Sequence, residues 1–156
     1  DVEKFAEICA DEEVMKYIGG GTHDKAQTQI KINQWIKDYQ RDGFGLMALV
    51  HQQSNELIGF FFFFKQTVDN EACIELGYRL AKAYWNQGLA TEAALAVKNY
   101  AFDKLKLKSL VSIIHPENIQ SKNVATKVGM KLINKTNFKG FDVEIFGLSN
   151  HDSYYE

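Results

Sequence analysis

Cysteine and proline are scarce in this sequence, which has two cysteines and one proline among 156 residues. Cys9 and Cys73 are too few for a disulfide framework and lack the close spacing of metal ligands. The four histidines are scattered along the chain as well. We therefore expect no bound metal and a reducing compartment, for which the cytoplasm fits best.

Strong charge of one sign and long apolar runs are also missing. The formal net charge is −2, and the charged residues, 24% of the chain, are interspersed. A nucleic-acid-binding surface would need a basic stripe, and a membrane-spanning helix would need roughly 20 consecutive apolar residues. We expect neither a nucleic-acid nor a membrane partner. The composition is still compatible with a local basic pocket.

The length suits one domain with a substantial core, and no repeat or low-complexity linker divides the sequence. We therefore predict a single domain over residues 1–156. Apolar residues at helical spacing predict helices over 2–10, 23–42, 88–104 and 119–127. Runs of strand-forming residues between turn signals predict strands over 45–51, 57–66, 72–80, 109–115, 130–136 and 141–149.

Small and polar residues mark the ends of these elements. Residues 11–18 are predicted to form a short helical turn, which ends at the glycines 19–21. These three glycines are interpreted as a hinge. Thr22 caps the next helix, and Asp42-Gly43 ends it. Asp69-Asn70 makes a tight turn between two of three successive antiparallel strands. The strand, helix and strand over 72–115 form a right-handed crossover, and residues 153–156 have no predicted place.

Three apolar groups stand out in the sequence, and the first of them is assigned to the core. Phe60 to Phe64 is a run typical of a strand covered on both faces, and this reading is favoured over an aromatic-ligand pocket. The second helix has an apolar stripe of Ile30, Ile32, Trp35, Ile36 and Tyr39. The helix over 88–104 has a face of Leu89, Ala93, Ala96, Val97 and Tyr100.

The junction between the strand ending at Leu80 and the helix beginning near Gly88 suits an anion. The first N–H groups of a helix lack partners inside it and lie at the positive end of its dipole. Small residues such as Gly88 and Ala90 let a phosphate approach them closely. An isolated Gly-x-Ala is more often only a tight loop-to-helix join, so the junction needs a second signal.

Two motifs carry a family resemblance. Trp85-x-x-Gly88-x-Ala90 resembles the acyl-CoA pyrophosphate loop of the GNAT superfamily of N-acetyltransferases, and its surroundings resemble the Rim-type branch, which acetylates ribosomal-protein N termini. Asn118-x-x-Ser121, continuing to Gly129-Met130, is similar to the family's helix beside the cofactor. Two matches in the right order outweigh either alone.

The resemblance implies a fold and a cofactor. The fold class is α/β (α+β), with a mixed, mostly antiparallel sheet of about six or seven strands, helices on both faces and a splayed central strand pair. The first strand of the family is missing here, because residue 1 already begins a helix. Acetyl-CoA is the implied co-substrate, held by Tyr78, Arg79, Leu80, Asn86, Gln87, Gly88, Leu89, Ala90, Thr91, Asn118, Ser121 and Lys127.

Some cofactor contacts depart from the family pattern. Family loops commonly carry a basic residue or glutamine in place of Trp85 and a glycine in place of Asn86, although asparagine tolerates positive φ. A net acidic chain needs local cations for a polyanion. Lys82, Lys122 and Lys127 are the candidates.

The resemblance also assigns catalytic roles. Glu75 is the candidate base, because Rim-type enzymes commonly have a glutamate on this strand facing the acceptor amine; an exposed strand glutamate is the alternative. Ser121 is the candidate donor to the leaving sulfur, and Asn118 positions the pantetheine arm or a water. The tyrosine acid of many members is absent, because Ala125 occupies its place.

Together these residues imply direct transfer of an acetyl group from acetyl-CoA to a primary amine. The acceptor stays open among a protein N terminus, a polyamine, an aminoglycoside and an amino acid. The alternatives are a non-catalytic acyl-CoA-binding sensor domain and a purely structural module. The last hairpin, with Phe141 and Phe146, is a candidate edge for a homodimer.

Overall fold

The computed structural model describes residues 2–151, so the tail over 153–156 lies outside the described residues. These residues group into two compact units, one made of residues 2–62 and 78–89 and the other of residues 63–77 and 90–151. The single domain stays a prediction. No described helix is long and apolar enough to cross a membrane.

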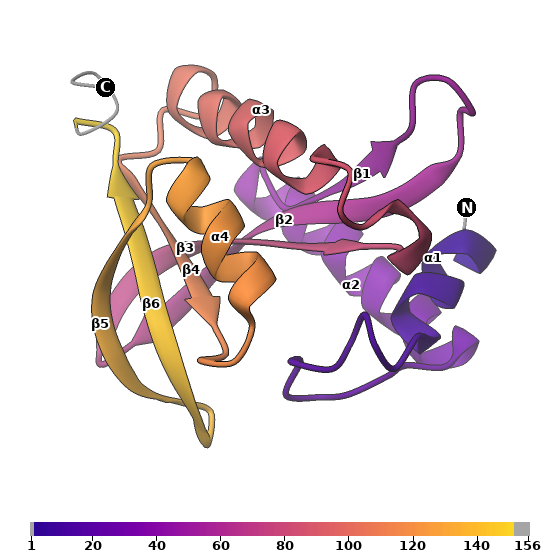
Figure 1. Cartoon of the computed structure of the whole chain (residues 1–156), viewed down its shortest axis with the longest axis horizontal. Coiled ribbons are helices and arrows are strands. Elements are labelled where there is room, and N and C mark those ends of the chain that lie inside the picture. The colour runs from indigo at the N-terminus through magenta and orange to yellow at the C-terminus, as the bar shows by residue number, and fades with distance from the viewer. Residues whose placement is uncertain (1, 152–156) are drawn as a thin grey trace. The chain divides into compact units, whose positions relative to one another are not determined.

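The predicted helices and strands are present, with ends shifted by one or two residues at most positions (Figure 1). The helices are α1 (Val2–Ala10), α2 (Lys25–Asp42), α3 (Leu89–Asp103) and α4 (Ile119–Lys127), with a 3₁₀ turn η1 (Lys82–Tyr84). The strands are β1 (Leu46–Val50), β2 (Leu57–Val68), β3 (Glu71–Leu80), β4 (Ser109–Ile114), β5 (Lys131–Phe138) and β6 (Phe141–Ser149).

The strands form a six-stranded sheet in the order β1-β2-β3-β4-β6-β5. β3 and β4 are parallel, whereas β1 with β2, β4 with β6 and β5 with β6 are antiparallel. A parallel pair needs a long connection, and α3 supplies it. The mixed, mostly antiparallel sheet is confirmed. The splayed central pair and the helices on both faces stay predictions.

Aromatic residues build the core of the first unit. Phe60 and Phe61 are buried on β2, and Phe60 stacks on Phe5 of α1 with ring centroids 4.3 Å apart. Phe61 stacks on Tyr78 of β3 at 5.2 Å. In the second unit Phe63 is almost fully buried. The core assignment of this run is therefore confirmed for the buried residues, while Phe64 is half-buried.

The cap of α2 differs from the prediction. Asp24, not Thr22, caps the helix: its side chain accepts a hydrogen bond from the Gln27 N–H, and the Gln27 side chain accepts one from the Asp24 N–H. This reciprocal capping box satisfies two otherwise unpaired donors. Gly43 ends the helix with φ of 76°, as predicted. Residues 12–17 form turns, in which the Met15 N–H donates to the Asp11 carbonyl at 3.0 Å, the single helical turn predicted here.

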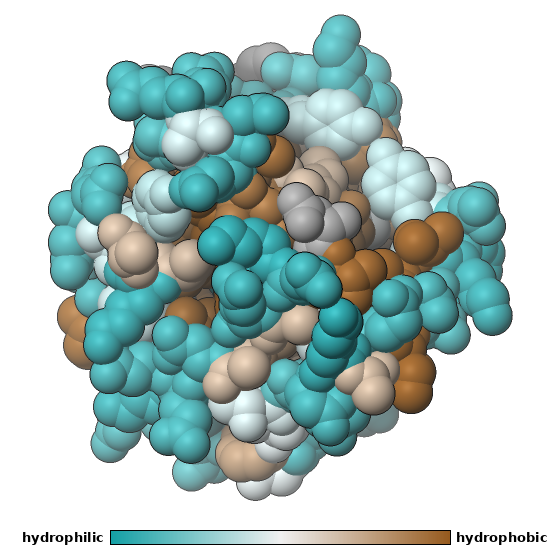
Figure 2. All heavy atoms as spheres, turned by 90° about the vertical axis from the view of Figure 1, so that its right-hand side faces the viewer, coloured by the Kyte–Doolittle hydropathy of each residue, from teal (hydrophilic) through white to brown (hydrophobic). Residues whose placement is uncertain are grey.

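The apolar stripe of α2 is largely at the surface. Ile30 and Ile36 are 69% and 52% exposed. Figure 2 shows apolar side chains, in brown, reaching the surface between hydrophilic ones on one face of the molecule. Periodicity identifies an apolar face but cannot say how much of it a neighbouring element covers.

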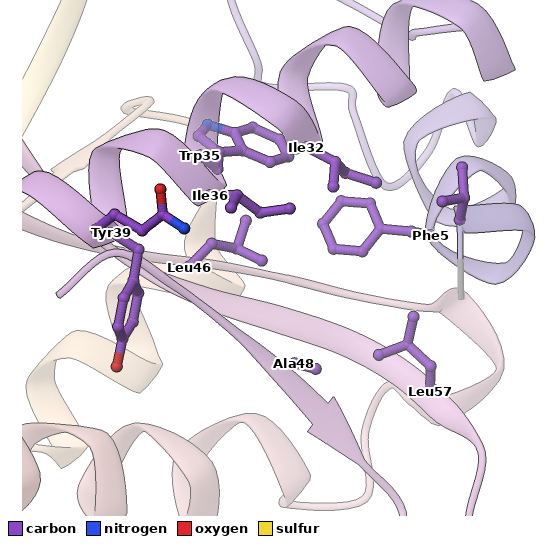
Figure 3. A pocket seen from close by; sticks show the side chains of 10 residues that line it. Phe5, Ile32, Trp35, Ile36, Tyr39, Leu46, Ala48 and Leu57 are labelled. Carbon is purple, nitrogen blue, oxygen red and sulfur yellow. The ribbon is translucent and has the colours of Figure 1, made fainter. Parts of the chain in front are cut away.

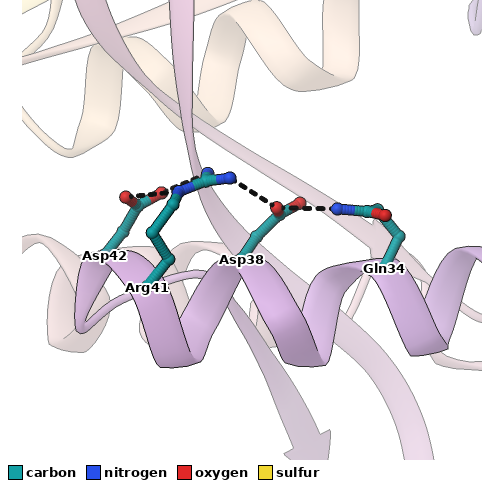
Figure 4. A network of polar contacts seen from close by, with 4 residues as sticks. All are labelled: Gln34, Asp38, Arg41 and Asp42. Carbon is teal, nitrogen blue, oxygen red and sulfur yellow. Dashed lines mark hydrogen bonds and ion pairs between the residues drawn. The ribbon is translucent and has the colours of Figure 1, made fainter.

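A polar network surrounds the last turns of α2 (Figure 4). Arg41 pairs with Asp38 at 3.2 Å and with Asp42 at 2.7 Å, and Gln34 donates a hydrogen bond to Asp38. The hydrogen bond to Asp42 raises the pKa of Arg41. Two aspartates near the negative end of a helix dipole are unfavourable, and Arg41 between them offsets this.

The buried residues of α3 are not those of the apolar face noted in the sequence. Ala94, Ala101 and Phe102 are buried, whereas Ala96 and Tyr100 are exposed. The helix is apolar on more than one side, so its sequence does not select the face that packs. The helix itself and its bounds agree with the prediction.

The β5–β6 hairpin forms one border of the sheet (Figure 1). Lys139 and Gly140 both have positive φ, which suits the tight turn between antiparallel strands. Phe146 is buried and Phe141 is 49% exposed, and β6 lies between β4 and β5. The edge strand is therefore β5, which corrects the part of the dimer-edge proposal that rests on Phe146.

The tip of the β2–β3 hairpin is fastened to β5. Asp69 and Asn70 make the predicted turn, both with positive φ. The Asp69 carboxylate accepts hydrogen bonds from Asn134 Nδ2 at 2.9 Å and from Thr136 Oγ1 at 2.8 Å. These contacts, here called the Asp69 clamp, join two hairpins that lie far apart in the sequence.

Candidate functional site

The chain between β3 and α3 forms a loop that leads directly into a helix N-terminus. η1 follows Leu80, and α3 begins at Leu89, directly after Gly88. Asn86 and Gly88 have φ of 59° and 77°, and a Cβ placed on Gly88 would meet open space. The positive φ expected for Asn86 is confirmed. The loop thus leaves room beside the first backbone N–H groups of a helix.

Side chains already occupy two carbonyls of β3. Trp85 Nε1 donates a hydrogen bond to the Leu80 carbonyl at 2.7 Å, and the Arg79 guanidinium donates to the Tyr78 carbonyl. Each of these carbonyl oxygens has a second lone pair, so it can still accept a further hydrogen bond from a ligand. Trp85, the departure from the family pattern, therefore ties the loop back to the end of its own strand.

Gly59 of β2 allows β3 to pack closely. A Cβ at Gly59 would collide with the Arg79 carbonyl, and the Ala81 N–H donates to the Ile58 carbonyl at 2.7 Å. Only a glycine permits this approach of two backbones. The Arg79 carbonyl therefore faces β2.

Two of the three candidate phosphate lysines already have carboxylate partners. Lys82 Nζ lies 2.7 Å from Glu13, and this hydrogen bond raises the pKa of Lys82. Lys122 Nζ lies 3.0 Å from Glu144. Lys127 is exposed in the last turn of α4.

Glu75 is half-buried on β3 and lies in register with Val111 of β4. Its Oε2 accepts a hydrogen bond from Gln66 Nε2 at 2.9 Å. Cys73 lies two residues earlier, and burial, followed by the charge of Glu75, raises the pKa of its thiol. Glu75 is therefore neither fully exposed nor buried, and its role as a base stays a prediction.

The sequence did not indicate two residues beside Glu75. Gln66 is one, because its contact crosses between strands. Ser112 is the other, and its Oγ donates to the Leu76 carbonyl at 2.7 Å. A hydroxyl in the otherwise apolar strand 110–114 was the available signal. This hydrogen bond occupies a backbone acceptor of β3 with a side chain of β4.

The second motif positions the start of α4. Asn118 is its N-cap, with Oδ1 accepting from the Ser121 N–H at 3.2 Å, and the Asn118 N–H donates to the His115 carbonyl. Ser121 is half-buried in the first turn, and Ala125 is 4% exposed. Asn118 therefore has a structural role at this turn, which accounts for an asparagine in the motif without any ligand.

Two lysines fasten α4 in the second unit, where the helix lies against β4. Lys98 of α3 donates to the Val128 carbonyl at 3.1 Å, beyond the helix C-terminus. Lys122 pairs with Glu144 of β6, which is nearly buried and also lies 3.7 Å from Lys135. A cation at the C-terminal carbonyls of a helix is favourable.

The Lys122–Glu144 pair predicts a pH-dependent stability. The hydrogen bond from Lys122 lowers the pKa of Glu144, so this carboxylate stabilises the fold above its unfolded pKa. That stability is lost as the pH falls from about 5 through the lowered pKa. We expect Glu144→Gln to lower Tm at pH 7, with the difference from the wild type shrinking toward pH 3.

Thermal unfolding between pH 3 and 8 measures this effect. Glu12→Gln, an exposed glutamate in a turn, is the control and is expected to follow the wild-type curve. A constant Tm difference between Glu144→Gln and the wild type across the whole range would contradict the assignment.

An apolar pocket of about 510 Å³ lies within the first unit (Figure 3). Figure 3 shows Phe5, Trp35, Leu46 and Leu57 turned toward it from α1, α2, β1 and β2. Its polar lining is Gln40 with the polar ends of Tyr39 and Trp35. None of the predicted site residues lines it, and a pocket without cations does not suit a polyphosphate.

The described residues contain no group of three or more histidine, cysteine, aspartate or glutamate side chains placed to hold a metal ion.

Comparison with known proteins gives consistent matches. A family model described as acetyltransferase (GNAT) domain matches residues 1–131. The protein YkkB of Bacillus subtilis is 32% identical over 140 residues, covering 85% of this chain and 78% of YkkB. The uncharacterized N-acetyltransferase YnaD of the same organism is 30% identical over 131 residues, covering 84% and 74%.

Solved structures share the fold. An acetyltransferase (GNAT family) from Bacillus anthracis superposes with a TM-score of 0.83 at 26% identity, covering 97% of this chain and 90% of that one. At 15% identity, the ribosomal-protein-S5-alanine acetyltransferase from Vibrio fischeri has a TM-score of 0.80, covering 97% and 89%. At 12% identity, AAC(6′)-Ib in complex with acetyl-CoA has a TM-score of 0.77, covering 99% and 90%.

Proposed function

Because this chain belongs to the acetyltransferase (GNAT) family, we propose that it transfers an acetyl group from acetyl-CoA directly to a primary amine. The observation that carries the proposal is the loop before α3, where positive φ at Asn86 and Gly88 leads into a helix N-terminus. Open space at Gly88 fits the approach of a pyrophosphate.

We assign the cofactor contacts to the backbone of this loop and to Leu89, Ala90 and Thr91 at the start of α3. Acetyl-CoA supplies the acetyl group and a thiol leaving group. The backbone groups of Tyr78, Arg79 and Leu80 are the proposed partners of the pantetheine arm, and Trp85 and Arg79 each donate one hydrogen bond to the carbonyls of Leu80 and Tyr78. Lys127 is the proposed partner of the cofactor phosphates, because Lys82 and Lys122 already form ion pairs with glutamates.

Glu75 is the proposed base that takes the proton of the acceptor amine, directly or through water. Ser121 is the proposed donor to the leaving thiolate, whose thiol has a pKa of roughly 8.5. Asn118 holds the first turn of α4, which carries Ser121. The backbone N–H at Leu80 is the proposed oxyanion donor, a contribution of about 3 kcal/mol in comparable sites.

The proposed acceptor is a protein N terminus, as in the Rim-type branch. An N-terminal amine has a pKa of about 7.7–8.0, whereas a lysine-type amine near 10.4 costs about 3.5 kcal/mol more to deprotonate. One half-buried glutamate, held by a hydrogen bond, is a weak base. It therefore suits the amine that is already partly neutral.

A second candidate is a non-catalytic acyl-CoA-binding sensor. Two observations favour it: the buried Ala125 stands where many members have a tyrosine acid, and Trp85 fastens the loop to the Leu80 carbonyl. Such a domain would bind the cofactor and transfer nothing.

Two measurements separate these functions. A thermal-shift titration with acetyl-CoA and desulfo-CoA reports binding, because a ligand of the native state raises Tm. Thiol release with N-terminal peptides, polyamines, aminoglycosides and amino acids reports transfer. A Tm rise with thiol release supports the enzyme, a rise without release supports the sensor, and the absence of both would overturn the two proposals together.

A further inference from the structure

Gln66 and Glu75 form a polar pair on neighbouring strands of the second unit. Gln66 Nε2 donates to Glu75 Oε2 at 2.9 Å, and both side chains are half-buried. We propose that Gln66 is the positioning residue for Glu75, fixing the orientation of its carboxylate and favouring its ionised form. The inference rests on the proposed function, in which Glu75 is the base.

The chemistry of the two groups defines the direction of this bond. An ionised carboxylate only accepts hydrogen bonds, so the amide NH₂ of Gln66, and not its carbonyl, must face Glu75. A hydrogen bond to the charged form of an acid favours that form. Gln66 therefore keeps Glu75 deprotonated and able to take a proton, while restricting rotation of the carboxylate about its last bond.

The hairpin supports a fixed geometry. A two-residue turn at Asp69-Asn70 joins the strands that carry Gln66 and Glu75, and the Asp69 clamp ties the tip of this hairpin to β5. Two strands held at their turn and by their sheet neighbours cannot slide past each other. The positions of the Gln66 and Glu75 backbones relative to each other are therefore fixed by the register of the hairpin.

Cys73 is one titratable neighbour of this pair. It lies two residues before Glu75 on β3, and its pKa is raised, so its thiol is neutral where acetyl transfer would be measured. A neutral thiol does not compete with Gln66 as a charge partner of Glu75. Cys73→Ser is therefore expected to leave the pH dependence unchanged.

Two variants of Gln66 test the proposal. Gln66→Glu keeps the shape but replaces the donor with a second carboxylate, so one of the two acids is held protonated. Gln66→Met keeps the length and removes the hydrogen bond. We expect kcat/KM at pH 7 to fall about 10-fold or more for Gln66→Glu and about 3-fold for Gln66→Met.

The pH profile separates positioning from a merely structural effect. We expect the acidic limb of kcat/KM to move to higher pH in both variants, more in Gln66→Glu, while the Tm rise with acetyl-CoA stays at the wild-type value. Thr67→Met, on the exposed neighbouring residue of β2, is the matched control and keeps the wild-type profile. Unchanged acidic limbs in both Gln66 variants would overturn the proposal.

A direct titration keeps this inference separate from the proposed function. Carboxyl ¹³C NMR with labelled glutamate, assigned through Glu75→Gln, follows Glu75 without any acetyl acceptor. We expect its midpoint to move to higher pH in Gln66→Glu and Gln66→Met. A wild-type chain without thiol release would overturn the proposed transfer alone, whereas an unmoved Glu75 midpoint would overturn the role of Gln66 alone.

Discussion

Replacing Glu75 with glutamine is expected to lower kcat for acetyl transfer by about 10²–10⁴-fold, the usual contribution of a positioned general base. Glutamine has the size of glutamate, and its amide oxygen can still accept the hydrogen bond from Gln66, so the strand pairing of β3 is kept. The loss is therefore chemical. Initial rates of thiol release at saturating acetyl-CoA and peptide measure it.

The control for this variant lies on the same strand. Glu71→Gln removes an equal charge from an exposed position of β3 and is expected to keep wild-type kcat. The Tm rise with acetyl-CoA should be equal in both variants, since neither changes the loop before α3. A Glu75→Gln enzyme with wild-type kcat over pH 6–9 would exclude Glu75 as the base.

Replacing Gly88 with glutamate is expected to weaken acetyl-CoA binding by about 100-fold or more. The residue has φ of 77°, where a side chain costs roughly 1–2 kcal/mol of backbone strain. The new carboxylate would also occupy the open space in which we place the pyrophosphate, and like charges would then repel. Loss of the Tm rise with acetyl-CoA and desulfo-CoA measures the effect.

Gly140 offers a matched control for the strain. It has φ of 88° in the β5–β6 turn, and a Cβ there would also meet open space. Gly140→Glu therefore carries the same strain and the same charge but should retain the full Tm rise. If Gly88→Glu binds acetyl-CoA as well as Gly140→Glu does, the pyrophosphate does not bind at this loop.

Local sequence signals predicted the elements and their turns well. Gly43 and Asp69-Asn70 end their elements as predicted, because a positive φ is a requirement that few residue types meet. The N-cap of α2 could also have been predicted from the sequence. Asp24 followed three residues later by Gln27 is a capping-box pattern, which Thr22 lacks.

The packing of the helices and the hydrogen-bond partners of side chains could not be predicted from the sequence. Nothing in α3 says that Ala101 is buried while Ala96 is exposed, because that choice belongs to its neighbours. The hydrogen bonds of Gln66 with Glu75 and of Ser112 with Leu76 cross between strands. Periodicity placed Glu75 on the correct strand, but its partner became visible only with the fold.

The Asp69 clamp has a consequence for the order in which this protein can fold. Its two hydrogen bonds join residues that are 65 and 67 positions apart in the sequence. During synthesis, the β2–β3 hairpin emerges long before Asn134 and Thr136 exist. Contacts of such long range carry a high entropic cost of closure and slow the folding of a domain. The hairpin that carries Glu75 therefore gains this tether only after residues 134 and 136 have been synthesised.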